Sequence, residues 1–350
     1  MRPSPLSDIQ FRSPLEQFVD LAVTAPSADN SQPWTFSIHD DQVICKYRHS
    51  GTIDDPFGGN GHGTLIAAGA LHENIDRLLK CCGLPSSRIN RQAEWEISFN
   101  TPSSPIPECD LVSAIQNRHT NRHRFAPPSA SSLDKLPKSH SGASRVVLLT
   151  HSSAIKTTAK AVRQCSEARF NSRNLHEWLF SSLRWTPEGV AIGDGLDLNT
   201  IDLPPGGKSF MRFISPWSRM EFLNHFGIYK LLAIADSAPI SQSSCLMAIV
   251  GGKTPDEIWE AGRHLQRLWL ELNQRGLAVH PYYVITDLTN RLDTGRIDAH
   301  WAPRVQTAKT QISRVLELGS DEQLHMLLRV GQATKQAVRS RRKPVKQFFA

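Results

Sequence analysis

Residues 25–34 read APSADNSQPW, and this short stretch guides the interpretation of the rest of the chain. Its two prolines end a preceding helix and fix a turn, because proline lacks a backbone N–H and locks φ. Between them lie Ser27, Asn30 and Gln32, whose polar side chains can donate and accept hydrogen bonds. A flat organic ligand with a polar edge would use these groups. A capped connector with polar turn residues accounts for them equally well.

The 25–34 loop lies between a predicted helix and a predicted hairpin. Apolar residues recur at helical spacing over residues 8–24. Beyond the loop, Trp34–Ile38 and Val43–Tyr47 alternate in polarity around His39–Gln42, which predicts two antiparallel strands. The loop therefore connects a helix directly to the first strand of a sheet.

The rest of the first part of the chain predicts a helix and another strand. The glycine-rich loop 51–63, with Gly58, Gly59, Gly61 and Gly63, matches neither the Walker loop nor the dinucleotide-binding spacing. A helix is predicted from Thr64 to about Cys82, with Gly83 as its C-cap, and a strand over residues 94–99. Residues 101–107, TPSSPIP, form the clearest linker. We therefore expect two units, residues 1–107 and 108–350.

The second unit alternates predicted helices and strands. Its helices are expected at 110–117, 152–183 and 255–275, and its strands at 145–150, 244–251 and 327–331. The helix at 255–275 begins with Pro255 at N1 and stops at Gly276. From Trp185 onward the chain contains an irregular segment with several glycines and prolines, including Asp194-Gly195-Leu196. We expect residues 185–220 to form a lid over the active site.

Composition limits the class of protein. The 350 residues are 39% hydrophobic and 21% charged, as in a globular protein, and no run of eighteen apolar residues predicts a membrane span. The N-terminus lacks the apolar core of a signal peptide, so a cytoplasmic protein is expected. The six cysteines show no metal-binding spacing, which favours reduced thiols.

The net charge of +7 raises the question of nucleic acid binding. The basic excess is concentrated near the C-terminus, at Lys335, Arg339, Arg341, Arg342, Lys343 and Lys346. A basic tail is usually solvated or binds phosphate, and no helix-turn-helix, zinc-finger or RNA-binding motif accompanies it. Nucleic acid is therefore an unlikely partner, and a small molecule is the expected one.

The pattern Ala-Pro-Ser-x-x-Asn-x-Gln-Pro-Trp at 25–34 resembles the signature loop of the flavin-dependent nitroreductase family. Residues 261–270 and 276–278 resemble that family's final core helix and the loop after it, and 340–345 resembles its closing basic motif. The family's Arg-rich element normally precedes the signature loop. Here the good match comes much later, at Asn117–Arg122, within an Arg-rich turn over 117–125.

This resemblance implies a site for FMN. Its phosphate and ribityl hydroxyls would be held by Arg118, His119 and Thr120, while Arg122 would stabilise the negative charge of the reduced flavin near N1 and O2. The resemblance also implies contacts from other segments. Arg341 and Arg342, in the basic motif 339–346, would bind the phosphate, and Asn30 and Gln32 would bind the ribityl chain or the ring edge. Pro26 and Ser27 would line the cofactor wall, and the backbone after Gly276 and Leu277 would approach N5.

Each assignment has a structural alternative. Residues 118–124 also read as a solvated helix end that a C-terminal helix dipole favours. His119 and His123 have the i,i+4 spacing of metal ligands, but no third ligand is evident and no metal is expected. Trp34, Trp178 and Trp269 are typical of core residues, and Asp194-Gly195 is typical of a turn.

Family members are homodimers with FMN at the subunit interface, so the inverted order of motifs resembles a dimer fused into one chain. The resemblance implies an α+β fold with mixed or antiparallel sheets flanked by helices, in two tandem nitroreductase-like halves that form an intramolecular pseudo-dimer. One FMN site per chain would lie between the halves. The chain would act as a monomer.

Three functions follow from this interpretation. The leading one is an FMN-dependent oxidoreductase that passes electrons from NADH or NADPH through flavin N5 to a nitroaromatic, quinone-like or enone-like acceptor, with no catalytic side chain assigned. A second is a flavin-binding or sequestering protein whose closed lid permits little turnover. A third is a scaffold without flavin whose basic tail binds an anionic partner.

Overall fold

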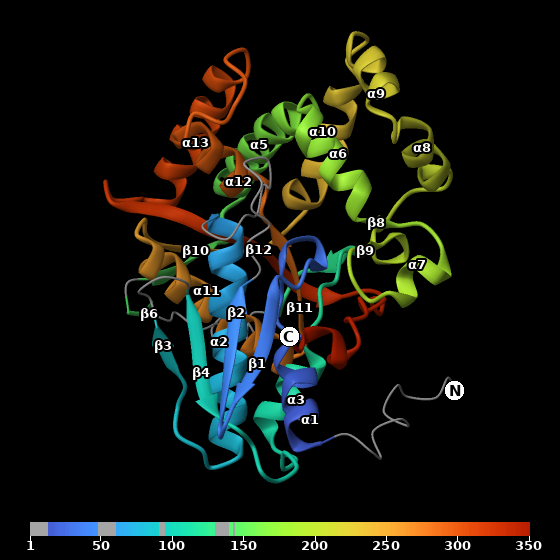
Figure 1. Ribbon diagram of the computed structural model, residues 1–350. Helices are drawn as coiled ribbons and strands as arrows, with labels where there is room; N and C mark the ends of the chain where they lie inside the picture. Colours follow the sequence, from blue (N-terminus) through green and yellow to red (C-terminus); the bar gives the residue numbers. More distant parts are fainter. Residues whose placement is uncertain (1–12, 48–60, 91–94, 130–139, 143) are drawn as a thin grey trace.

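The computed structural model describes residues 13–47, 61–90, 95–129, 140–142 and 144–350. These residues form an α+β protein with two main antiparallel sheets and helices packed against both (Figure 1). This confirms the predicted fold class at the level of antiparallel sheets flanked by helices. The predicted glycine-rich loop and the segment 133–138 lie largely or wholly outside the described residues.

The first sheet belongs to the first part of the chain. The elements up to residue 117 are α1 (Pro14–Ala22), η2 (Ala28–Asn30), β1 (Trp34–His39), β2 (Gln42–Tyr47), α2 (His62–Cys81), β3 (Arg88–Asn90), β4 (Glu96–Asn100) and α3 (Asp110–Asn117). The strand order is β1-β2-β4-β3. The predicted hairpin is confirmed, with Trp34 opposite Tyr47 and His39 opposite Gln42. Ser13 caps α1 in a reciprocal capping box with Glu16.

The second sheet has the order β11-β12-β10-β7-β6, with β5 also paired to β12. Its strands are β5 (Phe125–Ala126), β6 (His140–Ser141), β7 (Ser144–Leu149), β10 (Leu246–Gly252), β11 (Leu277–Tyr282) and β12 (Glu322–Ala333). Central strand β10 is buried on both faces, because it lies between β12 and β7 with helices above and below. This burial explains its unbroken apolar sequence.

The second part of the chain supplies most of the helices. They are α5 (Ser152–Arg169), α6 (Arg173–Ser182), α7 (Pro187–Ala191), α8 (Gly207–Ile214), α9 (Trp217–Asn224), α10 (Ile228–Ser241), α11 (Pro255–Gln274), α12 (Val284–Asp293) and α13 (Ala302–Leu316). Short pieces complete the fold: β8 (Leu183–Arg184), β9 (Leu196–Asp197), η3 (Leu198–Thr200) and η4 (Val345–Phe348). In Figure 1, α7, α8 and α9 lie along one side of the molecule, away from the first sheet.

Two apolar cores lie on opposite faces of the second sheet. Met247 and Ile249 of β10 join a core that also contains α1, α2, α3, α11 and the first sheet. Leu246, Ala248 and Val250 point the other way, into a core formed with α5, α10, α12 and α13. The alternation follows from the two-residue period of a strand. The first core therefore spans both parts of the chain.

Helices α2 and α11 contact each other closely at two glycines. A Cβ added to Gly69 of α2 would lie 2.0 Å from the carbonyl oxygen of Trp259, and one added to Gly262 of α11 would lie 2.3 Å from that of Ile66. Each glycine is the eighth of twenty residues in its helix. The two helices thus cross at equivalent positions, where only glycine leaves room for the backbones.

Polar contacts flank this crossing. The buried carboxylate of Glu73 on α2 pairs with Arg263 and Arg267 of α11, at 3.3 and 3.1 Å. Burial acts to raise the pKa of Glu73, but these arginines and Arg77 lower it overall. Gln266 Nε2 also donates to Asn74 Oδ1 at 2.7 Å. The crossing is therefore fixed in register as well as packed.

Histidines also join the two parts of the chain. His62 begins α2, and its two ring nitrogens lie 2.8 Å from Tyr283 Oη and 3.0 Å from His325 Nδ1. His325 is the extra residue of a β-bulge in β12, where Ile249 faces Met326 and Val250 faces Leu324. Burial is the main cause that lowers the pKa of both histidines, that of His325 to about 4. Both rings are therefore neutral at pH 7.

The last residues of the chain return to the first sheet. Phe348 is buried in the first core, and Phe349 forms a parallel bridge with Phe36 of β1. The backbone N–H of Ala350 donates to the carbonyl of Phe36 at 2.9 Å. Strand β1 thus gains a partner on its outer side, which covers an edge that would otherwise be open.

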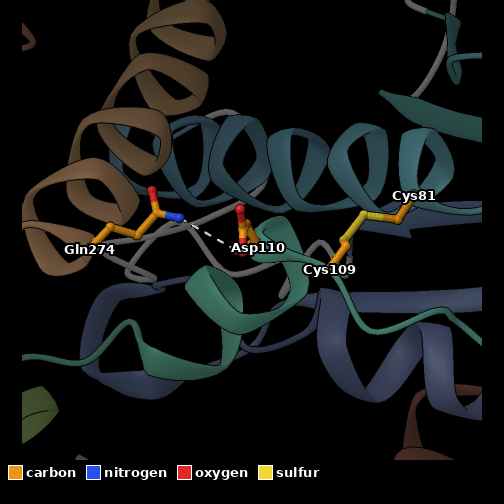
Figure 2. Close-up of a disulfide and its surroundings, with 4 residues drawn as sticks. All are labelled: Cys81, Cys109, Asp110 and Gln274. Atoms are coloured by element: carbon orange, nitrogen blue, oxygen red, sulfur yellow. Dashed lines mark hydrogen bonds between the residues drawn. A yellow bond between two sulfur atoms is a disulfide. The ribbon is translucent and has the colours of Figure 1, made fainter.

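Cys81, the last residue of α2, forms a disulfide with Cys109, the residue before α3 (Figure 2). Beside it, Gln274 Nε2 of α11 donates to the carbonyl oxygen of Asp110 at 3.4 Å (Figure 2). The prediction that all six cysteines are reduced thiols is therefore wrong for this pair. Helices α2 and α3 pack together, and this tertiary contact brings two distant cysteines side by side.

The predicted helix over 152–183 is wrong as a single helix. The chain forms α5 and α6 with a break at Phe170–Ser172, where Asn171 Nδ2 donates to the carbonyl of Glu167 and Asn224 Nδ2 donates to that of Phe170. Such side-chain bonds to the backbone compete with the helical ladder.

Among the described residues, no helix combines the length and apolar character needed to cross a membrane.

Candidate functional site

The 25–34 loop connects α1 to β1, as predicted, and holds an unusual backbone. Asp29, Asn30 and Gln32 have φ values of +46°, +57° and +51°. Asparagine and aspartate tolerate this left-handed region best, whereas glutamine occupies it at a cost. The N–H of Gln32 donates to Ser27 Oγ at 3.1 Å, which steadies the turn. Three such residues within four positions indicate that tertiary contacts impose the loop's shape.

Those contacts come from two distant segments. Asn30 Nδ2 donates to the carbonyls of Gly193 and Arg341, at 3.2 and 3.0 Å. Gln32 Nε2 donates to Gly193 as well, at 2.9 Å, while its Oε1 accepts from the N–H of Lys343 at 3.2 Å. The loop therefore meets both the predicted lid segment and the basic C-terminal segment.

Asn30 also presents an unsatisfied acceptor. Its side chain is only 7% exposed, and its Oδ1 is buried without a hydrogen-bond partner among the described residues. The loss of hydration at a buried amide oxygen is costly unless a donor replaces the water. A ligand with an N–H or O–H group would supply that donor.

Arg118 and Arg342 converge on the C-terminal end of α1. Both donate to the carbonyl of Thr24, at 2.8 and 2.9 Å, and Arg342 Nε donates to that of Val23 at 3.0 Å. The Arg118 guanidinium also lies 4.7 Å above the ring of Trp269. Cations at the C-terminal end of a helix are favourable, because its free carbonyls carry partial negative charge.

These arginines form a concentration of positive charge. Burial, together with the charges of Arg342 and Arg339, lowers the pKa of Arg118 to about 9, and burial lowers that of Arg342 to about 10. Neither side chain forms an ion pair with a carboxylate in the described part of the chain. Arg118 Nε is buried without an acceptor. The arrangement is suited to an anion such as a phosphate.

Arg122 lies in a second group with His280 of β11 and Arg329 of β12. Arg122 Nη1 donates weakly to Thr200 Oγ1 at 3.3 Å, and Arg329 Nη1 lies 3.3 Å from His280 Nδ1. Burial, followed by the two arginines, lowers the pKa of His280 well below its usual range. Burial lowers the pKa of Arg122, although Asp29 of the loop counteracts this effect.

The remaining predicted residues surround these two groups. The His119 N–H donates to Asn273 Oδ1 at 3.3 Å, and Asn273 Nδ2 donates to the carbonyl of Leu277 at 2.8 Å. Gly276 ends α11 with φ +75°. Arg341 has an exposed side chain and contacts Asn30 through its carbonyl, while Pro26 and Thr120 are partly buried in their loops.

A tight turn at Gly193-Asp194-Gly195 lies between the loop and the basic segment. Gly193 has φ +87°, and a Cβ there would lie 2.1 Å from the carbonyl oxygen of Arg342. Arg184 pairs with Asp194 at 2.7 Å, and Trp178 Nε1 donates to Asp29 Oδ2 at 3.0 Å. The turn thus closes the side of the 25–34 loop that carries the Asn30 and Gln32 amides.

Sequence interpretation missed two of these residues. Gly193 gave no signal, because only the fold shows which carbonyl meets Asn30 and Gln32. Arg329 had a signal: it is a lone charge inside the apolar strand Leu327-Leu328-Arg329-Val330, and it is 3% exposed. An ionisable group buried in a central strand marks a candidate functional position.

Comparisons with known proteins give distant similarities. No protein-family model matches the chain. The uncharacterized protein MT1398 of Mycobacterium tuberculosis (strain CDC 1551 / Oshkosh) is 24% identical over 355 residues, which cover 97% of this chain and 48% of MT1398. The chain thus spans about half the length of the curated relative it matches.

Several solved structures overlap part of the chain. They include an iodotyrosine deiodinase bound to FMN and 3-iodo-L-tyrosine (12% identity, TM-score 0.35, 66% of this chain and 94% of that one). The FMN- and NADPH-dependent nitroreductase NfnB from a Sphigopyxis strain has 18% identity and a TM-score of 0.30, over 67% and 90% of the chains. A nitroreductase with bound FMN from Desulfitobacterium hafniense DCB-2 has 12% identity and a TM-score of 0.34, over 66% and 92%. Similarity at this level does not establish the fold or function of this chain.

Proposed function

We propose that this chain is an FMN-dependent oxidoreductase of the nitroreductase type. The observation that supports it is the convergence, around one end of α1, of the 25–34 loop with two arginines that have no carboxylate partner among the described residues. Asn30 and Gln32 come from the first part of the chain, and Arg118 and Arg342 come from the second. The sequence of the loop gives the chemical class, because it resembles the flavin-binding loop of that family.

The residues present fit the chemical groups of FMN. A phosphate would satisfy the positive charge at Arg118 and Arg342, including the unpaired Arg118 Nε. A donor on the flavin edge or ribityl chain would satisfy the unpaired Oδ1 of Asn30. The Asn30 and Gln32 amide donors are held by the Gly193 carbonyl, so we expect the Gly193 turn to move when the cofactor enters.

In this proposal the protein binds and orients, while bound FMN supplies the electron-transfer chemistry between NADH or NADPH and the acceptor. Arg122 holds positive charge beside the loop, where charge on the reduced cofactor is to be stabilised. His280 is neutral and buried between Arg122 and Arg329, so it adds no charge there. No general acid is assigned.

We further propose that the two parts of the chain, residues 1–107 and 108–350, act as a fused dimer with one flavin site between them. Helices α2 and α11 support this, since each has twenty residues and each approaches the other at its eighth. The first core contains apolar residues from both parts. A monomer is the expected functional state.

Asn30→Ala and Arg118→Ala are both expected to weaken FMN binding, although they lie in different parts of the chain. Loss of the charged contact of Arg118 should cost about 1.5–3 kcal/mol. The measurement is a titration of flavin-free protein by quenching of FMN fluorescence. Arg314→Ala, on the exposed face of α13, is the control. If all three variants bind FMN with the wild-type affinity, the proposed site is wrong.

A second function, flavin sequestration with little turnover, is favoured by the contacts of the lid segment. Gly193 accepts from both loop amides, and Thr200 accepts from Arg122. In this proposal residues 193–200 cover the groups that would hold the cofactor. A lid that must open for exchange would retain the flavin and restrict access of an electron acceptor.

Gly193→Ala is expected to loosen this lid, because the new Cβ would meet the Arg342 carbonyl at 2.1 Å. A strain of about 1–3 kcal/mol in the closed form would speed flavin release by roughly 5- to 150-fold. Release is followed by dilution of the loaded protein, and turnover with NADH and NADPH is measured in parallel. Gly206→Ala has a similarly positive φ of +80° with nothing within 4 Å, so it isolates the clash. Faster turnover in Gly193→Ala alone supports sequestration, and unchanged release and turnover contradict it.

A further inference from the structure

A polar cavity of about 270 Å³ opens beside Arg122. It lies between the turn after α3, the end of α10 and strand β12. Its charged and hydrogen-bonding side chains are Arg122, His123, Arg124, Asp202, Gln242, Ser243, Ser244 and Arg329. Among the residues to which the 25–34 resemblance assigns flavin contacts, Arg122 alone lines this cavity.

Two arginines, Arg122 and Arg329, line the cavity wall. Burial lowers the pKa of each overall and outweighs the effect of Asp29, which acts to raise that of Arg122, and of Asp202, which acts to raise that of Arg329. Neither Arg122 nor Arg329 forms an ion pair within the described part of the chain. Arg329 is 3% exposed, and its contacts include the carbonyl of His123, the ring of His280, the side chain of Tyr282 and the face of Phe125 at 4.1 Å. A buried cation without an anionic partner is unfavourable, which favours binding of an anion.

The other charged groups do not cancel this potential. Asp202 pairs with His123 at 3.0 Å, and its side chain is 50% exposed, so it lies at the solvent side of the cavity. The last carbonyls of α10 are already occupied, since Gln242 and Ser243 donate to Ala238 and Ile240. Ser243 Oγ donates to the carbonyl of Pro239 at 2.7 Å. Arg124 adds a third guanidinium to the lining.

We propose that this cavity binds a small organic carboxylate. A planar carboxylate matches the fork of an arginine, and a second arginine and the hydroxyl of Ser244 offer further donors. The cavity is slightly smaller than the about 300–1,000 Å³ of sites for drug-sized ligands, so the ligand is expected to be no larger than a substituted benzoate. The proposal does not depend on flavin binding.

The test is a calorimetric titration of the flavin-free full chain with benzoate and, separately, with benzamide, which has the same shape without the charge. Benzoate is expected to bind saturably with one site per chain, and benzamide at least about tenfold more weakly. Arg329→Gln should reduce benzoate affinity about 10- to 100-fold. Arg314→Gln, which removes an arginine from exposed α13, should leave it unchanged.

Arg329 is buried, so its substitution could impair folding. Arg124 is exposed, and Arg124→Gln therefore provides a variant whose folding is not at risk. It should lower benzoate affinity severalfold. Three outcomes would each overturn the proposal. Benzoate and benzamide could bind with equal affinity, or Arg314→Gln could lose as much benzoate affinity as Arg329→Gln. The third is saturable binding of inorganic phosphate by a chain that does not bind benzoate. An FMN titration of the wild-type chain keeps the two proposals distinct: absence of FMN binding together with saturable benzoate binding would contradict only the flavin proposal.

Discussion

Gly262→Ala is expected to destabilise the protein by about 3 kcal/mol or more, at or above the upper end of the usual range for overpacked cores. The new Cβ would lie 2.3 Å from the carbonyl oxygen of Ile66 and 2.9 Å from its carbon. These are backbone atoms of α2, so no side chain can rotate away. The helices must separate, and the apolar contacts of the first core are lost with them. Urea unfolding followed by circular dichroism gives the free energy.

Gly189→Ala is the matched control for this prediction. Gly189 also lies in a helix, α7, but its nearest neighbours to an added Cβ are at 3.6 Å and its backbone is not left-handed. Alanine there should be neutral or slightly stabilising, because it limits the unfolded chain. Comparable destabilisation of both variants would mean that the α2–α11 crossing is not the close contact described above.

The stability of the protein is expected to fall as the pH drops from about 6.5 to about 4, and His325 is expected to account for about 3 kcal/mol of this loss. In the folded chain the pKa of His325 is lowered to about 4, mainly by burial, whereas the unfolded chain has the ordinary value near 6.5. Between these values the unfolded state binds the additional proton. The contribution is therefore complete above the unfolded pKa and is lost as pH falls through the folded one. Urea unfolding at several pH values measures it.

His325→Gln should flatten this part of the pH profile, since the buried position no longer takes up a proton on unfolding. His62 has a lowered pKa of the same origin and should leave a residual slope. The control is His225→Gln, at an exposed position after α9, which should keep the wild-type profile. A profile for His325→Gln that superimposes on the wild type would contradict the burial of a neutral imidazole at this bulge.

The elements nearest the quoted motifs could be predicted well from sequence. The 25–34 loop lies between a helix and a hairpin as expected, and α3 spans residues 110–117 as predicted. Helix α11 begins at Pro255, with Thr254 and Glu257 in a capping box, and ends before Gly276. These signals are local: caps, prolines, glycines and periodic apolar residues. The roles assigned to Arg118 and Asn30 remain predictions, although the structure brings their segments together.

What could not be predicted depends on tertiary contact. Helices α9 and α10 lie in a segment without a clear apolar period, and several of their large apolar side chains are exposed, including Phe222 at 63%. The long helix expected at 152–183 is interrupted by side-chain bonds to the backbone from Asn171 and Asn224. The Cys81–Cys109 disulfide and the Gly193 contact with Asn30 join residues far apart in the chain, which spacing in the sequence does not reveal.

Residues 345–350 pack against the first sheet, so this sheet and its core cannot be completed during synthesis until these residues have been made. Strand β1 is synthesised well before its outer neighbour at Phe349 and the buried Phe348. At translation rates of about 5–20 residues per second, the roughly 240 residues between the linker and this segment take about 10–50 s. For that time the first sheet has an open edge and an incomplete core. The nascent chain is therefore expected to need protection from aggregation until residues 345–350 emerge.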